Sequence, residues 1–369
     1  MTLPVQTPAS ADEAAAVLAG GQVTRPVGGR TKLTWGAIGT PPELELSTER
    51  LNELVEHNEG DLTAVLQAGV RLSDAQAKFA RAGQRLSLDP PDPGGRATIG
   101  GVLATSDSGP LRHRYGGARD LVLGIQVALP DGTVARAGSR VIKNVAGYDL
   151  SKLMCGAHGT LGVICEVIVR LHPLPPRTVT VVARGDSAAA LTSAVDGLRR
   201  HPLELEALDV AWKGGSGAIL ARAAGRACDS IAETVARLVS GAGLSCEVVE
   251  EDDALWAEQR SAQRADAIVR VSFLPAELER LLSAAPKAVV RAGAGLAFVA
   301  VEPTADAVQR LRGHLAPWPC VLLDAPEALR EQVDPWGLGD SPEARLMERV
   351  KVRFDPDGIL NPGRYVGGL

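Results

Sequence analysis

The stretch PPDPGGRATIGGVLA, residues 90–104, is the most informative part of this chain. Thr98 places a hydroxyl beside Gly100 and Gly101, which have no side chains, and this combination suits a flat ring or a pyrophosphate lying against the main chain. Prolines and glycines crowd the wider region from Leu88 to Gly117. A long irregular stretch inside a compact domain is usually functional, so we expect a ligand site here.

Three further glycine-containing stretches flank it in the chain: RPVGGRTKLTWG at 25–36, KNVAGYD at 143–149 and GAHGTLGVI at 156–164. A strand that ends in Gly28-Gly29 lets backbone N–H groups approach a phosphate, and the hydroxyl and lysine that follow add donors and charge. An ordinary β-turn explains the two glycines equally well. Residues 25–36 alone are therefore weak evidence for a phosphate site.

Taken in order, with Asn361-Pro-Gly near the end, these motifs resemble the vanillyl-alcohol-oxidase-type (PCMH-type) FAD-binding family. Within it, the chain is similar to the smaller flavin-binding subunit, the E subunit, of bacterial glycolate oxidase complexes. The resemblance implies an α+β fold: a two-lobed PCMH-type FAD-binding domain at 1–175, a cap domain with an antiparallel sheet and helices (a ferredoxin-like repeat) at 176–333, and a C-terminal segment, 334–369, that returns to the FAD domain.

The resemblance also implies which positions bind FAD. The pyrophosphate loop would be Val27, Gly28, Gly29, Arg30, Thr31 and Lys32, and the ribityl and pyrophosphate region would include Pro91, Thr98, Ile99, Gly100 and Gly101. Ser106, Ser108, Gly109, Arg114 and Tyr115 would lie near the flavin or its diphosphate. Gly159, Thr160, Leu161, Gly162 and Ile164 would meet the adenosine end, and Asn361 would return to the isoalloxazine.

The chain departs from the family at several positions. Arg30 stands where a third glycine is usual, so it either accepts an uncommon backbone conformation or adds a charge facing phosphate. No histidine occurs in this loop, and the expected FAD is therefore noncovalent. At His158 a structural role is favoured over substrate contact. Lys143 and Tyr148 are candidates near the flavin, although Lys143 could equally order a loop.

The substrate side lacks the histidine cluster that the catalytic D-2-hydroxyacid dehydrogenases of the family carry after the cap as general base or metal site. The only histidines in the sequence of residues 176–335 are His201 and His314. The resemblance then implies an FAD-binding subunit of a glycolate (2-hydroxyacid) oxidase complex, which oxidises glycolate to glyoxylate with a larger catalytic flavin subunit and an iron–sulfur subunit. A self-sufficient D-2-hydroxyacid dehydrogenase and a flavin-free scaffold are the alternatives, and no catalytic residue is assigned.

Secondary-structure signals agree with this division. Ser10 and Glu13 have capping-box spacing before a helix over 10–19, and Ser73 and Gln76 repeat it before a helix ending near Gly83. Between 178 and 323 two β-α-β-β-α-β patterns follow one another, which predicts one antiparallel sheet with helices on one face. Ser341 and Pro342 begin a final helix.

Charge, hydrophobic pattern and cysteine spacing limit the partners, the location and the metal centres that we expect. A net charge of −5 gives no reason to expect nucleic acid or an anionic membrane as a partner. No apolar run is long enough for a transmembrane helix and no signal-peptide pattern opens the chain, so we expect a cytoplasmic protein that can lie peripheral to the inner membrane through its partners. The five cysteines form no C-x-x-C pair, which predicts reduced thiols, no iron–sulfur centre and no metal site in this chain.

Overall fold

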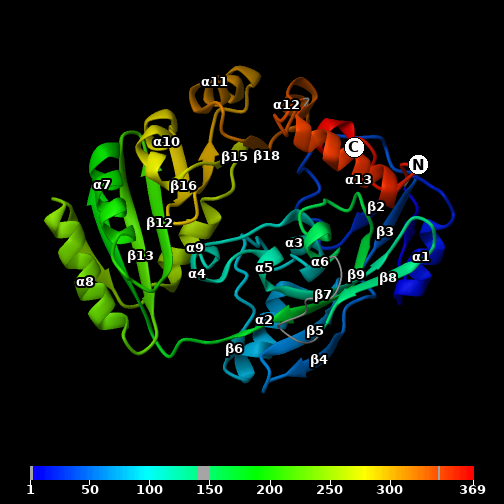
Figure 1. Ribbon diagram of the computed structural model, residues 1–369, viewed down its shortest axis with the longest axis horizontal. Helices are drawn as coiled ribbons and strands as arrows, with labels where there is room; N and C mark the ends of the chain where they lie inside the picture. The colour runs from blue at the N-terminus through cyan, green and yellow to red at the C-terminus, as the bar shows by residue number, and fades with distance from the viewer. Residues whose placement is uncertain (1–2, 140–149, 340) are drawn as a thin grey trace.

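The computed structural model describes residues 3–139, 150–339 and 341–369. Figure 1 shows a large sheet with its helices on one side of the molecule and a second body that contains both chain ends on the other. The helices are α1 (Ala11–Leu18), α2 (Leu72–Arg81), α3 (Ile99–Thr105), α4 (Arg112–Tyr115), α5 (Ala118–Leu121), α6 (Leu150–Met154), α7 (Ala188–Arg199), α8 (Cys228–Gly241), α9 (Asp253–Ser261), α10 (Leu278–Ala284), α11 (Ala305–Leu315), α12 (Glu327–Gln332) and α13 (Pro342–Phe354), with 3₁₀ turns at Pro275–Glu277 and Val366–Gly368.

The body that holds both chain ends has two main sheets. A three-stranded parallel sheet has the order β1 (Val5–Gln6), β3 (Leu44–Ser47), β2 (Thr24–Val27). A five-stranded antiparallel sheet has the order β4 (Leu54–Asn58), β5 (Thr63–Gln67), β9 (Val163–Arg170), β7 (Val122–Ala128), β8 (Val134–Gly138), and β6 (Gln84–Arg85) pairs with β10 (His172–Pro173). Leu360 bridges to Thr24 in parallel, so the C-terminal segment joins the edge of the small sheet.

The middle of the chain forms one eight-stranded antiparallel sheet. Its order is β14 (Ser245–Val249), β11 (Thr178–Gly185), β13 (Ser216–Ala224), β12 (Leu205–Lys213), β16 (Lys287–Arg291), β17 (Leu296–Ala300), β15 (Ile268–Ser272), β18 (Cys320–Asp324). The pairing of β12 with β16 joins the two β-α-β-β-α-β units. The predicted fold class, including the single antiparallel sheet, is confirmed. The boundaries at 175/176 and 333/334 stay predictions.

Strand alternation gives the large sheet two different faces. On one face, valines such as Val269 and Val271 pack in a core under α7, α8, α10 and α11. On the other face, Ile268 and Phe298 join a cluster with Trp35 from the N-terminal part of the chain. This second face therefore packs against the body that carries the glycine-rich loops.

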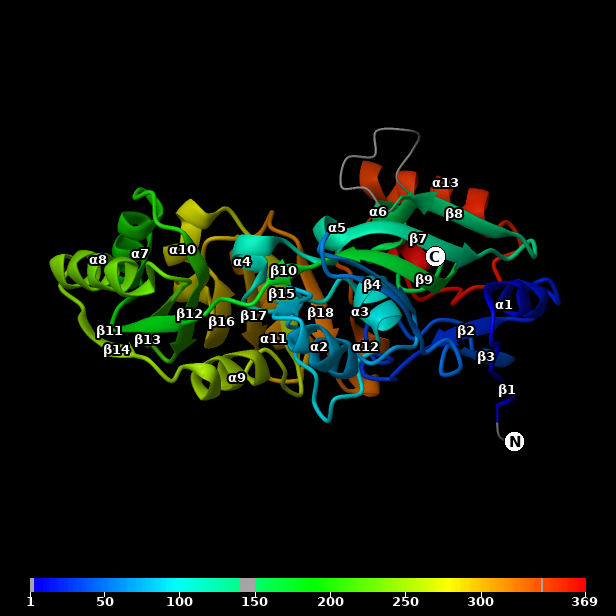
Figure 2. The same ribbon diagram turned by 90° about the horizontal axis from the view of Figure 1, so that it is seen from below.

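Helix α9 was not predicted, and it lies on the face of the large sheet opposite α7, α8 and α10 (Figure 2). Trp256, on α9, is buried against Ala207 and Leu220 of the sheet. The helix carries few apolar residues, and only Trp256 and Gln259 are buried, so its sequence has no clear helical stripe.

The N-caps of α1 and α13 are formed as predicted by Ser10 and Ser341, and Ser187 forms that of α7. The cap proposed for α2 is wrong: the residue before the helix is Arg71, with no side-chain cap. The Ser73 hydroxyl instead donates to the Gly95 carbonyl at 3.4 Å. The start of α2 is held by the main chain, because the Leu72 N–H donates to the Ala97 carbonyl at 2.8 Å.

The stretch from Leu88 to Gly117 is not irregular throughout, because α3 and α4 lie inside it. Thr98 is the N-cap of α3, and its Oγ accepts the Gly101 N–H at 3.3 Å. The threonine and glycine that we interpreted as a ligand platform therefore also begin a helix. None of the helices in the three described ranges is both long and apolar enough to cross a lipid bilayer.

Candidate functional site

The glycine-rich loops meet around one cavity, which we call the loop cavity. It is formed by the turn after β2, one side of α3, the segment entering β9 and the C-terminal segment. Its walls are Arg25, Pro26, Val27, Gly28, Gly29, Arg30, Thr31, Lys32, Leu33, Thr48, Thr98, Gly100, Gly101, Ala104, Thr105, Met154, Ala157, His158, Gly159, Gly162, Val163, Ile164, Asn361 and Arg364. Segments more than 300 residues apart in the chain thus share one site.

Backbone donors line one wall of the loop cavity. Across the described ranges, the N–H groups of residues 28–32 donate to no protein acceptor. A run of backbone N–H groups that point into one concavity is an anion-binding arrangement. Lys32, almost fully buried, adds a cation to the same wall. This wall can hold a phosphate or pyrophosphate.

The turn can only be built with glycines. A Cβ on Gly28 would come within 2.3 Å of Thr98 Oγ1, and one on Gly29 within 1.6 Å of the Arg96 carbonyl oxygen. On the helix side, a Cβ on Gly100 would lie 2.7 Å from the Ala68 Cβ. The glycines let the turn, α3 and β5 pack main chain to main chain, and this packing fixes the orientation of the free donors.

Arg30 adopts the uncommon left-handed conformation, with φ of 58°. Its guanidinium is paired with Glu45 on β3, and Arg25 binds the same carboxylate with Nη2 2.6 Å from Oε1. The hydrogen bond from Arg30 is the main cause that holds the pKa of Glu45 below its usual value. Arg30 therefore accepts the uncommon backbone conformation, and its charge is paired with Glu45; a charge of Arg30 that faces phosphate stays a prediction.

The C-terminal segment closes the loop cavity. The Asn361 backbone N–H donates to the Thr24 carbonyl at 3.1 Å, and its side-chain Nδ2 donates to the His158 carbonyl at 2.9 Å. Arg364 Nη2 donates to the Leu33 carbonyl at 2.5 Å. These bonds tie the C-terminal segment to both the β2 turn and the segment before β9.

His158 lies in the wall of the loop cavity, within an aromatic cluster. Its ring centroid is 5.1 Å from that of Trp336 and 5.7 Å from that of Tyr365. Burial is the main cause that lowers its pKa to about 3, and Arg364 and Arg270 lower it further. The imidazole is therefore neutral at physiological pH, and it packs against aromatic rings as the structural interpretation requires.

Beside the loop cavity lies a second one, of about 210 Å³, which we call the sheet cavity. It separates the end of α3 and the start of α4 from strands β15, β17 and β18 of the large sheet. Its walls are Trp35, Ser106, Asp107, Ser108, Arg112, Arg270, Ser272, Leu296, Phe298 and Leu323.

Asp107 connects the two cavities, because its Oδ2 lies 3.2 Å from Lys32 Nζ. Both side chains are buried. Burial raises the pKa of Asp107, and the charges of Lys32 and Arg264 oppose that rise. The pair therefore forms the partition between the backbone donors of the loop cavity and the polar end of the sheet cavity.

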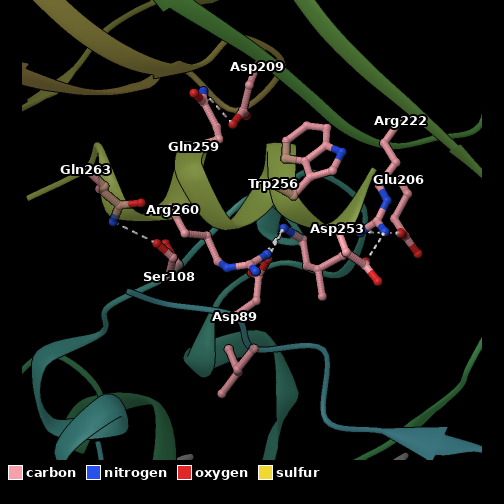
Figure 3. Close-up of polar contacts among 12 residues, drawn as sticks. Asp89, Ser108, Glu206, Asp209, Arg222, Asp253, Trp256, Gln259, Arg260 and Gln263 are labelled. Carbon is pink, nitrogen blue, oxygen red and sulfur yellow. Dashed lines mark hydrogen bonds and ion pairs between the residues drawn. The ribbon is translucent and has the colours of Figure 1, made fainter. Parts of the chain in front are cut away.

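Helix α9 and the residue Gln263 after it make polar contacts with Asp89 and with Ser108, which lines the sheet cavity (Figure 3). Gln263 Nε2 donates to the Ser108 carbonyl at 3.0 Å, and Gln263 Oε1 accepts from Arg291. Arg260 Nη1 lies 3.9 Å from Asp89, and burial is the main cause that raises the pKa of Asp89 to about 7. A polar network thus joins the large sheet to the loop before α4.

The structure brings most of the predicted FAD positions together, and leaves others away from the loop cavity. Ile99 and Leu161 are core residues, and Pro91 is buried without lining either cavity. Thr160 is turned inward, because its hydroxyl donates to Ala157 and its carbonyl accepts from Lys351. Ser106 and Ser108 line the sheet cavity instead.

Gly109, Arg114 and Tyr115 also lie outside the loop cavity. A Cβ on Gly109 would lie 1.9 Å from the Asp89 carbonyl oxygen, so this glycine serves chain packing. Arg114 pairs with Glu204 at 3.1 Å, and the Tyr115 hydroxyl donates to Glu206 at 3.2 Å. These acids, Glu204 just before β12 and Glu206 within it, hold Arg114 and Tyr115 against the large sheet, and their expected placement near the flavin stays a prediction.

Several residues of the loop cavity were not predicted. Arg25, Pro26, Leu33, Thr48, Ala104, Thr105, Met154, Ala157, Val163 and Arg364 belong to this group. Most are direct neighbours of motif residues, and Arg364 follows Asn361-Pro-Gly, so adjacency was the available signal. Lys143 and Tyr148 lie outside the described residues. In the parts of the chain that are described, no cluster of three or more histidine, cysteine or acidic residues is placed to hold a metal ion.

Comparison with known proteins gives evidence on FAD binding that is independent of the cavity geometry. Residues 4–138 match a family described as an FAD binding domain. The chain is 37% identical to glycolate oxidase subunit GlcD of Bacillus subtilis (strain 168) over 190 residues, which cover 50% of this chain and 40% of GlcD. It is 33% identical to glycolate oxidase subunit GlcE of Escherichia coli (strain K12) over 201 residues, covering 53% of this chain and 57% of GlcE. The match thus spans less than two thirds of either relative.

Among solved structures, an alkyldihydroxyacetonephosphate synthase superposes with a TM-score of 0.72. The superposition covers 97% of this chain and 75% of the synthase, at 16% sequence identity. At this identity the likeness concerns the fold alone, and it extends over the large sheet as well as the glycine-rich body.

Proposed function

Because the chain carries a PCMH-type FAD-binding domain and FAD is its cofactor, we propose that it is the FAD-binding subunit of a glycolate (2-hydroxyacid) oxidase complex. In that complex a larger flavin subunit oxidises glycolate to glyoxylate, and an iron–sulfur subunit passes the electrons on. The observation that carries the proposal is the row of free backbone donors at residues 28–32, closed by the C-terminal segment.

The residues present fit FAD. The free N–H groups of Gly28–Lys32, together with Lys32 Nζ, would hold the diphosphate, because they combine oriented donors with a cation. Gly159, Gly162 and Ile164 would meet the adenosine end, and Asn361 would lie toward the isoalloxazine. No cysteine lines the loop cavity in the described ranges, and the only histidine there, His158, packs between aromatic rings, which supports noncovalent binding.

Bound FAD supplies two-electron redox chemistry, and the protein sets its access and environment. Within the described ranges, no histidine lines the sheet cavity. His201 and His314 are exposed and lie at the ends of α7 and α11, on the opposite face of the large sheet. This placement favours electron transfer within a complex over substrate oxidation by the isolated chain.

The alternative of a self-sufficient 2-hydroxyacid dehydrogenase has one observation in its favour. Asp107, a buried carboxylate with a raised pKa, lines the sheet cavity and offers a proton acceptor in place of a histidine. Its charge is already paired with Lys32, so it is a weaker base than an unpaired carboxylate in the same place.

Anaerobic addition of glycolate separates these functions. We expect the isolated chain to be yellow with FAD and to keep its flavin absorption, whereas the same chain co-expressed with the larger flavin subunit is bleached. Bleaching of the isolated chain at a catalytic rate would establish the dehydrogenase instead. A colourless protein that takes up no added FAD would leave only the flavin-free scaffold.

A further inference from the structure

Two arginines line the sheet cavity. Arg270 comes from the middle of β15, and Arg112 comes from the first turn of α4. Within the described ranges, neither forms an ion pair or a hydrogen bond. They are close enough for Arg112 to lower the pKa of Arg270, although burial is the largest cause of that decrease.

An arginine in this position is costly unless an anion accompanies it. Removing a guanidinium from water is unfavourable, and only a paired, hydrogen-bonded charge recovers that free energy. The nearest carboxylate, Asp107, is already engaged by Lys32. The two arginines therefore leave a net positive charge in the sheet cavity that no carboxylate of the described residues neutralises.

The rest of the cavity indicates what kind of anion fits. Ser272 and Ser106 add hydroxyl groups, while Leu296, Phe298 and Leu323 form an apolar wall. A volume of 210 Å³ corresponds to about seven water molecules at roughly 30 Å³ each. A cationic end, hydroxyls and an apolar wall together suit a small organic acid better than an inorganic anion.

We infer that the sheet cavity binds a small carboxylic acid, whose carboxylate is held by Arg270 and Arg112. A guanidinium fork matches the two oxygens of a carboxylate. This goes beyond the proposed function, in which the substrate is oxidised on the larger subunit: here this chain binds a carboxylate itself, without turnover. Since the binding groups are arginines outside the loop cavity, the site does not depend on the assignment of the complex.

Isothermal titration calorimetry of the purified chain, saturated with FAD, with glycolate as the probe tests the inference. We expect saturable binding that Arg270→Gln weakens at least about tenfold, in line with a charge-assisted hydrogen bond. Arg270→Lys should recover part of the affinity. Arg184→Gln is the matched control, because Arg184 lies on the same sheet, is exposed and pairs with Glu247 outside the sheet cavity.

Three results would overturn the inference: no saturable binding of glycolate to the unaltered chain, equal binding by Arg270→Gln, or tighter binding of inorganic phosphate than of glycolate. If Arg270→Gln fails to fold, Arg112→Gln removes the second guanidinium from a different element, and unchanged glycolate affinity there would contradict the inference. Flavin content is measured on the same samples. A chain that binds glycolate but no FAD would refute the proposed function and leave the carboxylate site standing.

Discussion

Lys32 and Asp107 form a buried ion pair, with Nζ 3.2 Å from Oδ2, that separates the loop cavity from the sheet cavity. One partner belongs to the turn after β2 and the other to the loop after α3, so the pair also joins the two main motifs. Each charge depends on the other for its burial. The pair therefore links cofactor binding to the environment of the second cavity.

Replacing Lys32 by Met should weaken FAD binding and lower the free energy of unfolding by about 3 kcal/mol, because Asp107 loses its partner inside the protein. Adding Asp107→Asn should restore most of the stability and little of the FAD affinity. Chemical denaturation and FAD titration of the two single variants and the double variant measure these effects. Additive stability losses would show that the two residues do not interact.

Gly29→Ala should weaken FAD binding at least about tenfold, or about 1.4 kcal/mol, because the added Cβ would come within 1.6 Å of the Arg96 carbonyl and move the donor-bearing turn. Gly197→Ala is the control, since Gly197 lies within α7 with no atom near its Cβ position. It should stabilise the protein by about 0.5–1 kcal/mol and leave FAD affinity unchanged. Equal FAD affinity in Gly29→Ala and the unaltered chain would argue against the turn as the diphosphate site.

Tyr115→Phe should cost about 1 kcal/mol of stability, because the hydroxyl lost is the one that bonds Glu206 and Arg85. The affinity for FAD should stay the same, since Tyr115 is outside the loop cavity. Thermal denaturation and FAD titration distinguish this from the placement first expected from the sequence. A large loss of FAD affinity with unchanged stability would restore that earlier placement.

His158 predicts a pH dependence of stability. Its pKa falls from 6.5 to about 3 on folding, so between these values the unfolded chain binds a proton that the folded chain does not. The free energy of unfolding should therefore decrease as pH falls from about 6.5 toward 3, by at most about 1.4 kcal/mol per pH unit for this group. Denaturation curves of the unaltered chain and of His158→Gln test the slope, with exposed His201→Gln as control. The same slope in all three proteins would exclude His158 as the cause.

The sequence was most informative where one local signal sufficed. Ser10 and Ser341 cap the helices they were expected to cap. The alternating strands of the middle region gave the single antiparallel sheet, because burial on one face imposes a period of two. The glycines of the β2 turn pointed to the loop cavity, because their packing requires the absence of a Cβ.

Features that depend on contacts between residues distant in the sequence could not be predicted from local patterns. Arg270 occupies an ordinary position in an alternating strand, and only the pairing of β15 with β17 and β18 places it toward the glycine-rich body. Asp107 gains its role from Lys32, distant in sequence. Tyr115 follows a motif but is held elsewhere by Glu206, which no local pattern connects with it.

The central claim is that this chain holds FAD noncovalently in the loop cavity. The most direct measurement is the flavin content of the purified chain after saturation with FAD and gel filtration, followed by acid precipitation. The account predicts about one FAD for each chain, all of it released into the supernatant, and much less retained by Gly29→Ala. A protein that retains no flavin, or flavin that stays with the precipitate, would contradict it.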